Sequence, residues 1–328
     1  MCLGIESTAH TFGASLVDSE DNIVTNVNST YRPPPGVGIH PRKASEHLAS
    51  VADSIVKTAL STKSGWIEPN AIAYAAGPGL GPCLRIGATV GRALSSFLKK
   101  PLVPVHHGVA HLDIAMSIAK ARDPLAVLVS GGHTSILVHA GKRWKVYGET
   151  QDITLGNLLD MFAREAKLPS PGGPSVSKEA AKGVNMIKLP YTVKGNDVAY
   201  SGLLTAATSK LQRQGNLADI CFSLQETAFA MLAEAVERSL VQTRRSEVLI
   251  AGGVAASSRL KEMIGSVAED HGASFHPVPV EYSGDCGAQI ACSGRLAYES
   301  GLTVSTSDSF VIPRWRMDEV EVPWIPRN

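Results

Sequence analysis

Two histidines four residues apart give this chain its clearest capacity for chemistry. His107 and His111 lie in residues 105–113 (VHHGVAHLD), which lead into an apolar stretch ending near residue 121. If residues 107–121 form a helix, both imidazoles stand on one face, about 6 Å apart, and can share a metal ion. Asp285, in a Gly-flanked stretch, is the natural third ligand because no Cys-x-x-Cys pair is present. Histidines at this spacing are also common as caps or surface residues, so spacing alone leaves both interpretations open.

The elements that would position these groups are short apolar runs ending in turns of small residues. Residues 1–17 follow a pattern of strand, polar turn and strand, and residues 125–138 repeat it around Ser130, Gly131 and Gly132. Such turns place backbone N–H groups and small hydroxyls where a phosphate can bind. The repeat indicates an internal duplication, with two lobes that share a cleft.

The remaining pattern is that of a mixed α/β protein. Helical spacing of apolar residues, or a run between a strand and a turn, predicts helices over residues 44–60, 84–98, 156–167, 204–214, 225–243, 259–271 and 288–300. Further strands are expected at residues 71–76, 101–105 and 248–251, with a short strand or turn at 197–203. Gly and Pro predict a rigid turn at residues 169–174, and at 31–41 a surface loop that either covers the site or merely connects two elements.

Composition bounds the class of protein. The 328 residues exceed the usual size of a single core, and 44% hydrophobic with 19% charged residues is typical of a globular chain. A net charge of +1 provides no overall field for nucleic acid, so an RNA partner needs a local basic patch or helper proteins. Five cysteines without metal-ribbon spacing, no basic leader and no apolar run of membrane-spanning length lead us to expect a cytoplasmic protein.

Seven short motifs, taken together, resemble one family. They are residues 4–11 (GIESTAHT), 77–85 (GPGLGPCLR), the His107/His111 pair, 129–134 (VSGGHT), 171–174 (PGGP), 200–203 (YSGL) and 252–256 (GGVAA). In this order they resemble the tRNA threonylcarbamoyl-adenosine transferases, called TsaD in bacteria and known as the catalytic subunit of the KEOPS complex in archaea and eukaryotes. Residues 8–10 (TAH) resemble the archaeal and eukaryotic branch, and the resemblance covers nearly the whole chain.

The resemblance implies a two-lobed α/β architecture of the actin, sugar-kinase and Hsp70 (ASKHA) type, with duplicated mixed-sheet domains. The N-terminal lobe is expected to span residues 1–123 and the C-terminal lobe residues 124–304. A strap from about residue 305 to 328, which contains two tryptophans and several prolines, is expected to pack back on the first lobe.

The resemblance also implies an activity. Members of the family are understood to pass a threonylcarbamoyl group from threonylcarbamoyl adenylate to N6 of the adenosine 3′ of the anticodon (position 37) in ANN-decoding tRNAs. One divalent ion, iron or zinc, would be bound by His107, His111 and Asp285, and an adenine nucleotide is expected to fit the same cleft. The substrate-binding positions carried over are Leu128, Val129, Ser130, Gly131, Gly132, Asp160, Gly173 and Ser257.

Three positions depart from the family pattern. Archaeal members often have a metal-ligating tyrosine where this chain has Leu128, which leaves three protein ligands and more open positions on the ion. Ser177 replaces a usual acidic residue and Ser257 a usual asparagine, which would alter the strength and polarity of substrate contacts.

Three other functions compete with this one. A zinc protease usually has a glutamate beside its first histidine, and this chain has Gly108 there. A small-molecule kinase or ATPase of the same fold would use the phosphate-facing turns, but would need no histidine pair. A non-catalytic scaffold in a tRNA-binding assembly is the third. The resemblance further implies partner subunits, a small atypical kinase/ATPase and a dimerising subunit, that help to hold tRNA.

Overall fold

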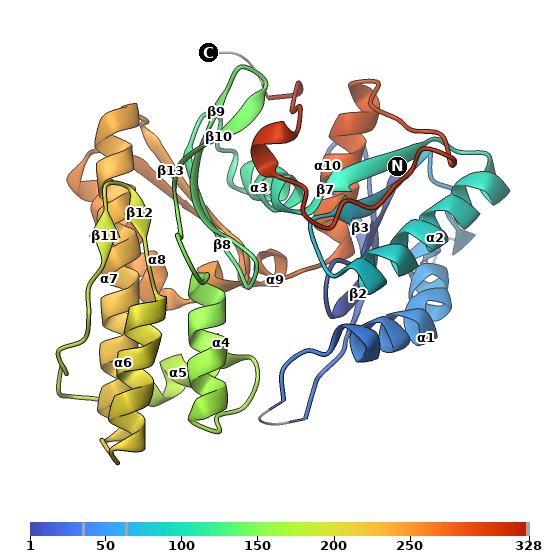
Figure 1. The fold of residues 1–328 in the computed structure, drawn as a ribbon. Coiled ribbons are helices and arrows are strands. Elements are labelled where there is room, and N and C mark those ends of the chain that lie inside the picture. Colours follow the sequence, from blue (N-terminus) through green and yellow to red (C-terminus); the bar gives the residue numbers. More distant parts are fainter. Residues whose placement is uncertain (35–36, 63–64, 326–328) are drawn as a thin grey trace.

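The computed structural model describes residues 1–34, 37–62 and 65–325, and it contains two five-stranded mixed sheets, each with its own helices (Figure 1). The first sheet has the order β3-β2-β1-β6-β7. Its strands are β1 (Cys2–Glu6), β2 (Thr11–Val17), β3 (Ile23–Thr30), β6 (Ala71–Gly77) and β7 (Leu102–His106). The pairs among β1, β2 and β3 are antiparallel, and β6 and β7 continue the sheet in parallel with β1.

The second sheet repeats this arrangement. Its order is β10-β9-β8-β13-β14, with an antiparallel trio followed by parallel pairs. Its strands are β8 (Leu125–Val129), β9 (Thr134–Ala140), β10 (Arg143–Glu149), β13 (Glu247–Ala251) and β14 (Ser274–Pro277). The internal duplication predicted from residues 1–17 and 125–138 is therefore confirmed.

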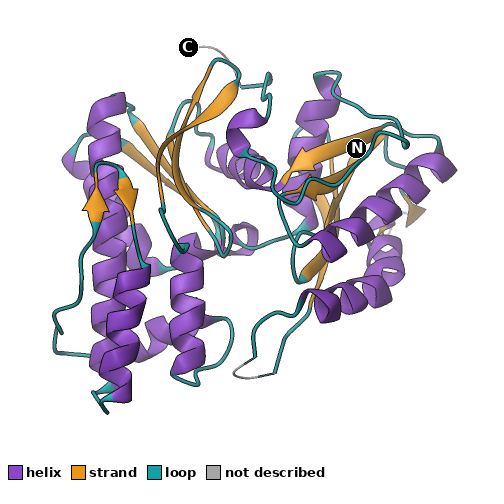
Figure 2. Ribbon diagram, in the orientation of Figure 1, coloured by secondary structure: helices purple, strands orange, loops and turns teal. Residues whose placement is uncertain are grey.

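Helices cover both sheets, as the colouring by secondary structure makes clear (Figure 2). Helices α1 (Pro41–Leu60) and α2 (Gly81–Leu98) pack on the first sheet. The second lobe carries α4 (Leu155–Glu165), α5 (Gly172–Ala180), α6 (Ser201–Gln212), α7 (Leu217–Thr243) and α8 (Ser258–Asp270). Short elements complete the fold: β4 (Ser61–Thr62), β5 (Gly65–Trp66), β11 (Val193–Lys194), β12 (Asp197–Val198), α9 (Val280–Ser283) and the 3-10 turns η1 (Gly253–Ala256) and η2 (Met317–Glu319).

Helix α3 (His107–Ala119) lies between the two sheets (Figure 1). It contacts β7 of the first sheet and β8 and β13 of the second. Its side chains Val109, Leu112 and Ala115 belong to a core cluster that also includes Leu128 and Leu249 of the second sheet. The helix with the histidine pair is thus fixed from both sides.

Helix α10 (Gly287–Glu299) corrects the predicted division into lobes. The sequence prediction placed it in the second lobe, within residues 124–304, but it packs on β1, β2 and β6 of the first sheet. The contact is close because the facing residues of the helix and the sheet are small. A Cβ on Gly4 would lie 2.1 Å from the Ala291 nitrogen, and one on Gly294 would lie 2.1 Å from the Ala73 Cβ. Gly287, Ala291 and Gly294 recur at helical spacing and present one small-residue face to the sheet.

The C-terminal strap also differs from the prediction. It contacts the first lobe, where the Ile312 N–H donates to the Ala76 carbonyl at 2.7 Å. It then crosses to the second sheet, where the Val322 N–H donates to the Lys142 carbonyl at 2.8 Å. Its apolar side chains Met317, Val320 and Val322 join the core around α3, so the strap packs on both lobes and not on the first alone.

Besides the short elements β4, β5, β11, α9, η1 and η2, several longer elements were not in the sequence prediction. Strands β3, β10 and β14 were not expected, and the predicted rigid turn at residues 169–174 runs into helix α5, which begins at Gly172. Within the predicted loop at 31–41, residues 31–34 and 37–40 have no regular structure, while residues 35 and 36 lie outside the described part of the chain. Over the ranges that the structure describes, no helix combines the length and apolar character needed to cross a membrane.

Candidate metal centre and adjoining cleft

The first turn of α3 positions both histidines. Strand β7 ends at His106, whose side chain caps the helix by accepting from the Val109 N–H at 3.2 Å. His107 and His111 follow on one face, with their ring centroids 4.7 Å apart. Both side chains are buried.

Asp285 reaches the same point from the link between α9 and α10. Its Oδ1 lies 3.4 Å from Nε2 of His107 and 3.4 Å from Nε2 of His111. The link is held against the first sheet, because a Cβ on Gly287 would lie 2.6 Å from the Ala14 carbonyl carbon. The three residues singled out from the sequence therefore converge, with one ligand atom from each lying within 4.8 Å of the others.

The spacing fits a single bound cation. Two ligand atoms, each about 2.1 Å from a tetrahedral ion, lie about 3.4 Å apart. In addition, Nε2 of His111 is buried and has no hydrogen-bond partner among the described residues. Two imidazoles and one carboxylate form a ligand set that both zinc and iron accept.

The two histidines differ electrostatically. Burial by itself lowers the pKa of His107, but the carboxylates of Glu6 and Asp285 outweigh it and raise this pKa to about 10. The pKa of His111 is lowered by burial and by the charge of His107, which outweigh the attraction of Asp285. Burial would raise the pKa of Asp285, yet the two imidazoles hold it well below its usual value.

Two further polar residues at the centre were not singled out from the sequence. Glu6, at the end of β1, is fully buried and places Oε2 3.0 Å from Nδ1 of His107. His133, after the Ser130 turn, interacts electrostatically with all three candidate ligands, and burial together with the charges of His107 and His111 lowers its pKa to about 4. The sequence feature that could have identified Glu6 and His133 is their position. Glu6 lies at the carboxyl end of an apolar strand, and His133 lies in the turn that follows one.

The predicted phosphate-facing turn lies beside this centre. The Ser130 hydroxyl accepts from the N–H groups of Gly132 at 3.2 Å and His133 at 3.0 Å. Gly131 and Gly132 are exposed and leave open space around them. Because Ser130 and Gly132 use their N–H groups within the turn, Gly131 is the residue best placed to offer one to a ligand.

Leu128 and Val129 have wholly buried side chains that belong to cores of the fold. A substrate could therefore meet them only through their backbone. Gly252, directly after β13, packs against the backbone of Val129. Its φ of 94° and a distance of 2.3 Å from a Cβ there to the Val129 carbonyl oxygen leave no room for a side chain.

Asp160 on α4 faces the first lobe. Its Oδ1 accepts from the Gly172 N–H at 2.7 Å, which ties α4 to the start of α5 and to Gly173. Burial raises the pKa of Asp160, and charge interactions with His10 of the first lobe and with Arg164 partly oppose the shift. Asp160 of the second lobe and His10 of the first are thus close enough for their charges to interact.

The two serine departures have partners of their own. Ser257 caps α8, where its hydroxyl accepts from the Leu260 N–H at 3.4 Å, and the neighbouring turn η1 contacts both β8 and α4. Ser177 donates to Oε1 of Gln225 at 2.6 Å. Ser257 therefore lies near the remaining predicted substrate residues, while Ser177 is tied to α7.

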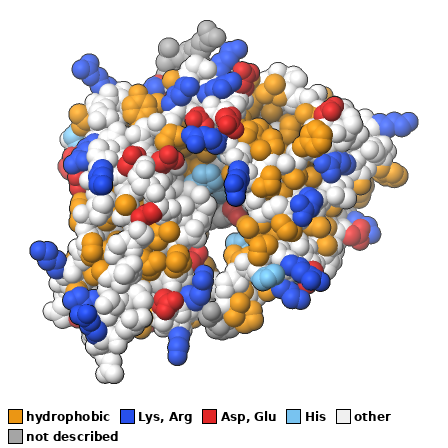
Figure 3. Space-filling model, viewed as in Figure 1, with side chains coloured by type: hydrophobic (Ala, Val, Ile, Leu, Met, Phe, Trp, Pro, Cys, Tyr) orange, Lys and Arg blue, Asp and Glu red, His pale blue; other side chains and the backbone are white. Residues whose placement is uncertain are grey.

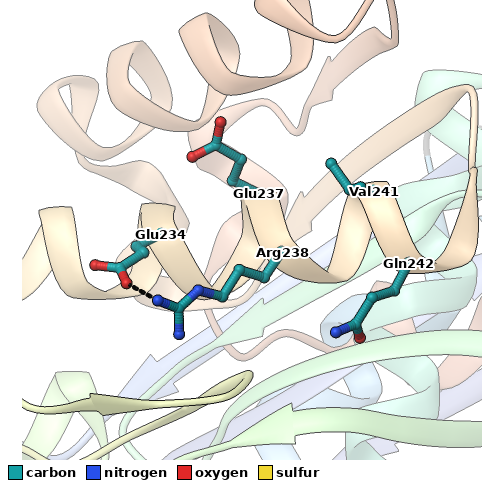
Figure 4. A pocket seen from close by; sticks show the side chains of 5 residues that line it. All are labelled: Glu234, Glu237, Arg238, Val241 and Gln242. Carbon is teal, nitrogen blue, oxygen red and sulfur yellow. Dashed lines mark ion pairs between the residues drawn. The ribbon is translucent and has the colours of Figure 1, made fainter.

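The surface agrees with this layout. Figure 3 shows the molecule hollowed between the two lobes, with histidine side chains along the hollow. A separate hollow lies on α7 in the second lobe (Figure 4) and is lined by Glu234, Glu237, Arg238, Val241 and Gln242. There Arg238 pairs with Glu234 at 2.5 Å, and no predicted site residue lines the hollow.

Comparison with solved structures supports the fold. The protein titled HypF from T. kodakarensis aligns with a TM-score of 0.62 and 16% identity over 91% of this chain and 48% of that one. The activator of 2-hydroxyisocaproyl-CoA dehydratase from Clostridium difficile aligns with a TM-score of 0.52 and 13% identity over 92% of this chain and 96% of that one. These likenesses confirm the predicted ASKHA architecture, and at such low identity they show the fold alone.

Comparison with known sequences identifies the family. The family model described as TsaD, tRNA N6-adenosine threonylcarbamoyltransferase, matches residues 22–292. Proteins named tRNA N6-adenosine threonylcarbamoyltransferase are 49% identical in Caldivirga maquilingensis (98% of each chain) and 50% identical in Pyrobaculum neutrophilum (99% of this chain, 96% of that one). A Methanocaldococcus jannaschii protein, named as a probable bifunctional tRNA threonylcarbamoyladenosine biosynthesis protein, is 45% identical over 99% of this chain and 60% of its own length. The chain therefore belongs to the TsaD family of tRNA N6-adenosine threonylcarbamoyltransferases.

Proposed function

We propose that this protein transfers the threonylcarbamoyl group of threonylcarbamoyl adenylate to N6 of the adenosine 3′ of the anticodon in ANN-decoding tRNAs, giving N6-threonylcarbamoyladenosine. Family membership and the names of relatives similar over their whole length support the reaction. The observation that carries the mechanism is the convergence of His107, His111 and Asp285 from two distant segments.

These three residues would hold one divalent ion, iron or zinc. When bound, the ion would supply Lewis-acid chemistry at substrate oxygens, which suits a reaction in which a weakly nucleophilic amine attacks a carbamoyl-phosphoric anhydride. In that reaction the bond from N6 to the carbamoyl carbon forms, the carbon–oxygen bond to the phosphate breaks, AMP leaves with the electron pair, and N6 loses a proton.

The rest of the cleft would bind and orient the adenylate. The N–H of the exposed Gly131 would bind an oxyanion, and the open space at Gly131 and Gly132 would let a phosphate approach the backbone. Asp160, Gly173 and the backbone at Leu128, Val129 and Ser130, all in the second lobe, would line one side of the cleft, together with Ser257 next to η1. A nucleotide-dependent kinase is not favoured, because such an activity gives no reason for a buried histidine pair and carboxylate aimed at one point.

Binding of tRNA would depend on partner subunits. The net charge of +1 supports this proposal, because a neutral protein has no overall field that gathers a polyanion. We propose KEOPS-type partners, a small kinase/ATPase and a dimerising subunit. The bifunctional name of the longer M. jannaschii relative is compatible with a further function coupled to this one.

Mass spectrometry of nucleosides tests the proposal. Transfer RNA is incubated with the protein, its partner subunits and threonylcarbamoyl adenylate, then digested and analysed. We expect N6-threonylcarbamoyladenosine with the wild type, at least about 100-fold less with His111→Ala, and wild-type levels with His271→Asn, which changes a surface histidine paired with Glu237. Absence of the product with the wild type would overturn the reaction, and full activity of His111→Ala would overturn the metal mechanism.

A further inference from the structure

Glu6 is a buried carboxylate that touches two separate parts of the site. It lies at the carboxyl end of β1 and has no exposed surface. One oxygen, Oε2, is 3.0 Å from Nδ1 of His107. The other, Oε1, accepts from the Thr8 N–H at 2.6 Å and from the Thr8 hydroxyl.

The chemistry of these contacts fixes where the His107 proton lies. A carboxylate only accepts hydrogen bonds, so all three partners of Glu6 must act as donors. Nδ1 of His107 therefore carries a hydrogen, and Nε2, 3.4 Å from Asp285, is the nitrogen that would exchange its proton for a bound cation. The Gln289 amide nitrogen approaches the same Nδ1 only to 3.4 Å, too far to compete with the carboxylate.

The Thr8 contact ties the same carboxylate to two turns of the first lobe, those after β1 and β6. The Thr8 carbonyl accepts from the Leu80 N–H at 2.7 Å. Gly79 packs so closely that a Cβ there would lie 2.5 Å from the Thr8 carbonyl oxygen. The turn after β1 and the turn after β6 are thus both anchored through Thr8 to Glu6.

We propose that Glu6 is a positioning residue that holds His107 in the tautomer and ring orientation needed for metal binding, and that it couples this ligand to the Thr8 turn. The inference rests on the metal centre of the proposed function. Carboxylates that accept from the second ring nitrogen of a ligating histidine raise its basicity and fix its orientation. The contacts of Glu6 are with His107 and Thr8, so it would act through these two residues.

Glu6→Gln is the informative substitution, because an amide cannot satisfy both contacts. If its oxygen accepts from the Thr8 N–H, its NH₂ group faces Nδ1 of His107 and favours the tautomer with the proton on Nε2. If its oxygen faces His107, the NH₂ group meets the Thr8 N–H donor. We expect zinc affinity, measured by competition with a chromophoric chelator, to fall by about 10–100-fold.

Two variants serve as controls. Thr8→Val keeps the backbone donor but loses the hydroxyl, so its zinc affinity should fall less than that of Glu6→Gln. Asp219→Asn removes another buried carboxylate that accepts from two backbone N–H groups, but in the second lobe, so its zinc affinity should equal the wild type. Circular dichroism and thermal unfolding establish that each variant is folded.

The outcomes separate this inference from the metal centre itself. If His107→Ala and His111→Ala bind zinc as tightly as the wild type, the metal centre is wrong. If those variants lose zinc while folded Glu6→Gln keeps wild-type affinity, the role of Glu6 alone is overturned.

A measurement on the wild type covers the case in which Glu6→Gln does not fold. Nitrogen-15 NMR of zinc-loaded protein with labelled histidine assigns the state of each ring nitrogen. We expect Nδ1 of His107 to be protonated and Nε2 to be bound to zinc. Coordination through Nδ1, or a proton on Nε2, would refute the inference.

Discussion

At the scale of the residue, the candidate metal centre depends on one carboxylate, whose negative charge is stabilised by two neighbouring histidines. Asp285 has its pKa kept low by His107 and His111 in spite of burial. Each of the three donors comes within reach of one point, so the loss of one leaves an incomplete ligand set. Substitution of Asp285 should therefore lower mainly the affinity for the metal ion.

Asp285→Asn tests this directly. The amide keeps the size of the side chain but loses the negative charge that a cation favours, so zinc affinity should fall by at least about 100-fold. Equilibrium competition against a chelator gives the value. Asp197→Asn, at a partly exposed carboxylate of the second lobe, is the matched control. Equal zinc affinity in Asp285→Asn and the wild type would remove Asp285 from the ligand set.

Asp219 gives a prediction about pH. Its carboxylate accepts from the N–H groups of Asn185 and Val184 and from the Asn185 amide, which lowers its pKa below 3.8. A lowered folded-state pKa stabilises the fold above the unfolded-state value, and that contribution is lost as pH falls through the folded value. Between about pH 7 and about pH 3, the thermal midpoint should therefore fall more in the wild type than in Asp219→Asn. Parallel pH profiles would contradict the assignment.

At the scale of the element, close packing of α10 on β1 sets the position of Asp285. Gly4→Ala would place a Cβ 2.1 Å from the Ala291 nitrogen and 2.5 Å from the Gly287 carbonyl oxygen. Either α10 or β1 must move, so the free energy of unfolding measured in urea should fall by about 1–3 kcal/mol. Gly202→Ala, where nothing lies within 4 Å, should leave stability unchanged or slightly raised. Equal stability in Gly4→Ala and the wild type would show that the contact is loose.

The three longer strands that the sequence failed to predict share a physical cause. Strands β3, β10 and β14 are all edge strands. In β3 half-buried and exposed residues alternate, and the polar Thr25, Asn26 and Asn28 hide the pattern. Such strands are stabilised by pairing with a neighbour that the local sequence does not reveal.

Helix α5 was missed for a different reason. Gly172, Gly173 and Pro174 are typical of a turn, but they occupy the first turn of the helix. Proline is tolerated there because the first N–H groups of a helix have no partner within it.

The three candidate metal ligands were predictable from local patterns, whereas their surroundings were not. His107 and His111 are one helical turn apart in sequence, and Asp285 stands before a clear helix. Glu6 meets His107 across 101 positions of the chain, and α10 joins the first sheet from the far end of the sequence. Contacts of this kind follow from topology, which residue spacing does not encode.

At the scale of the whole molecule, the strap fastens α3 between the two sheets. The Trp324 indole N–H donates to Oδ1 of Asp113 at 3.1 Å, and Asp113 is only 3% exposed. The strap thereby connects the end of the chain to the helix that carries both histidines.

Trp324→Phe isolates that hydrogen bond. It keeps an aromatic ring but leaves a buried carboxyl group with one donor fewer, so the free energy of unfolding should fall by about 1–3 kcal/mol. Trp66→Phe, at a side chain that is 55% exposed, should change it little. Equal stability in Trp324→Phe and Trp66→Phe would show that the strap does not depend on this contact.

Anomalous X-ray diffraction from protein loaded with zinc or iron, on a preparation shown to modify tRNA, tests the central claim most directly. The account predicts one strong peak about 2.0–2.2 Å from Nε2 of His107, Nε2 of His111 and a carboxylate oxygen of Asp285. A peak bound by other residues, or no peak in protein that still forms the modified nucleoside, would contradict it.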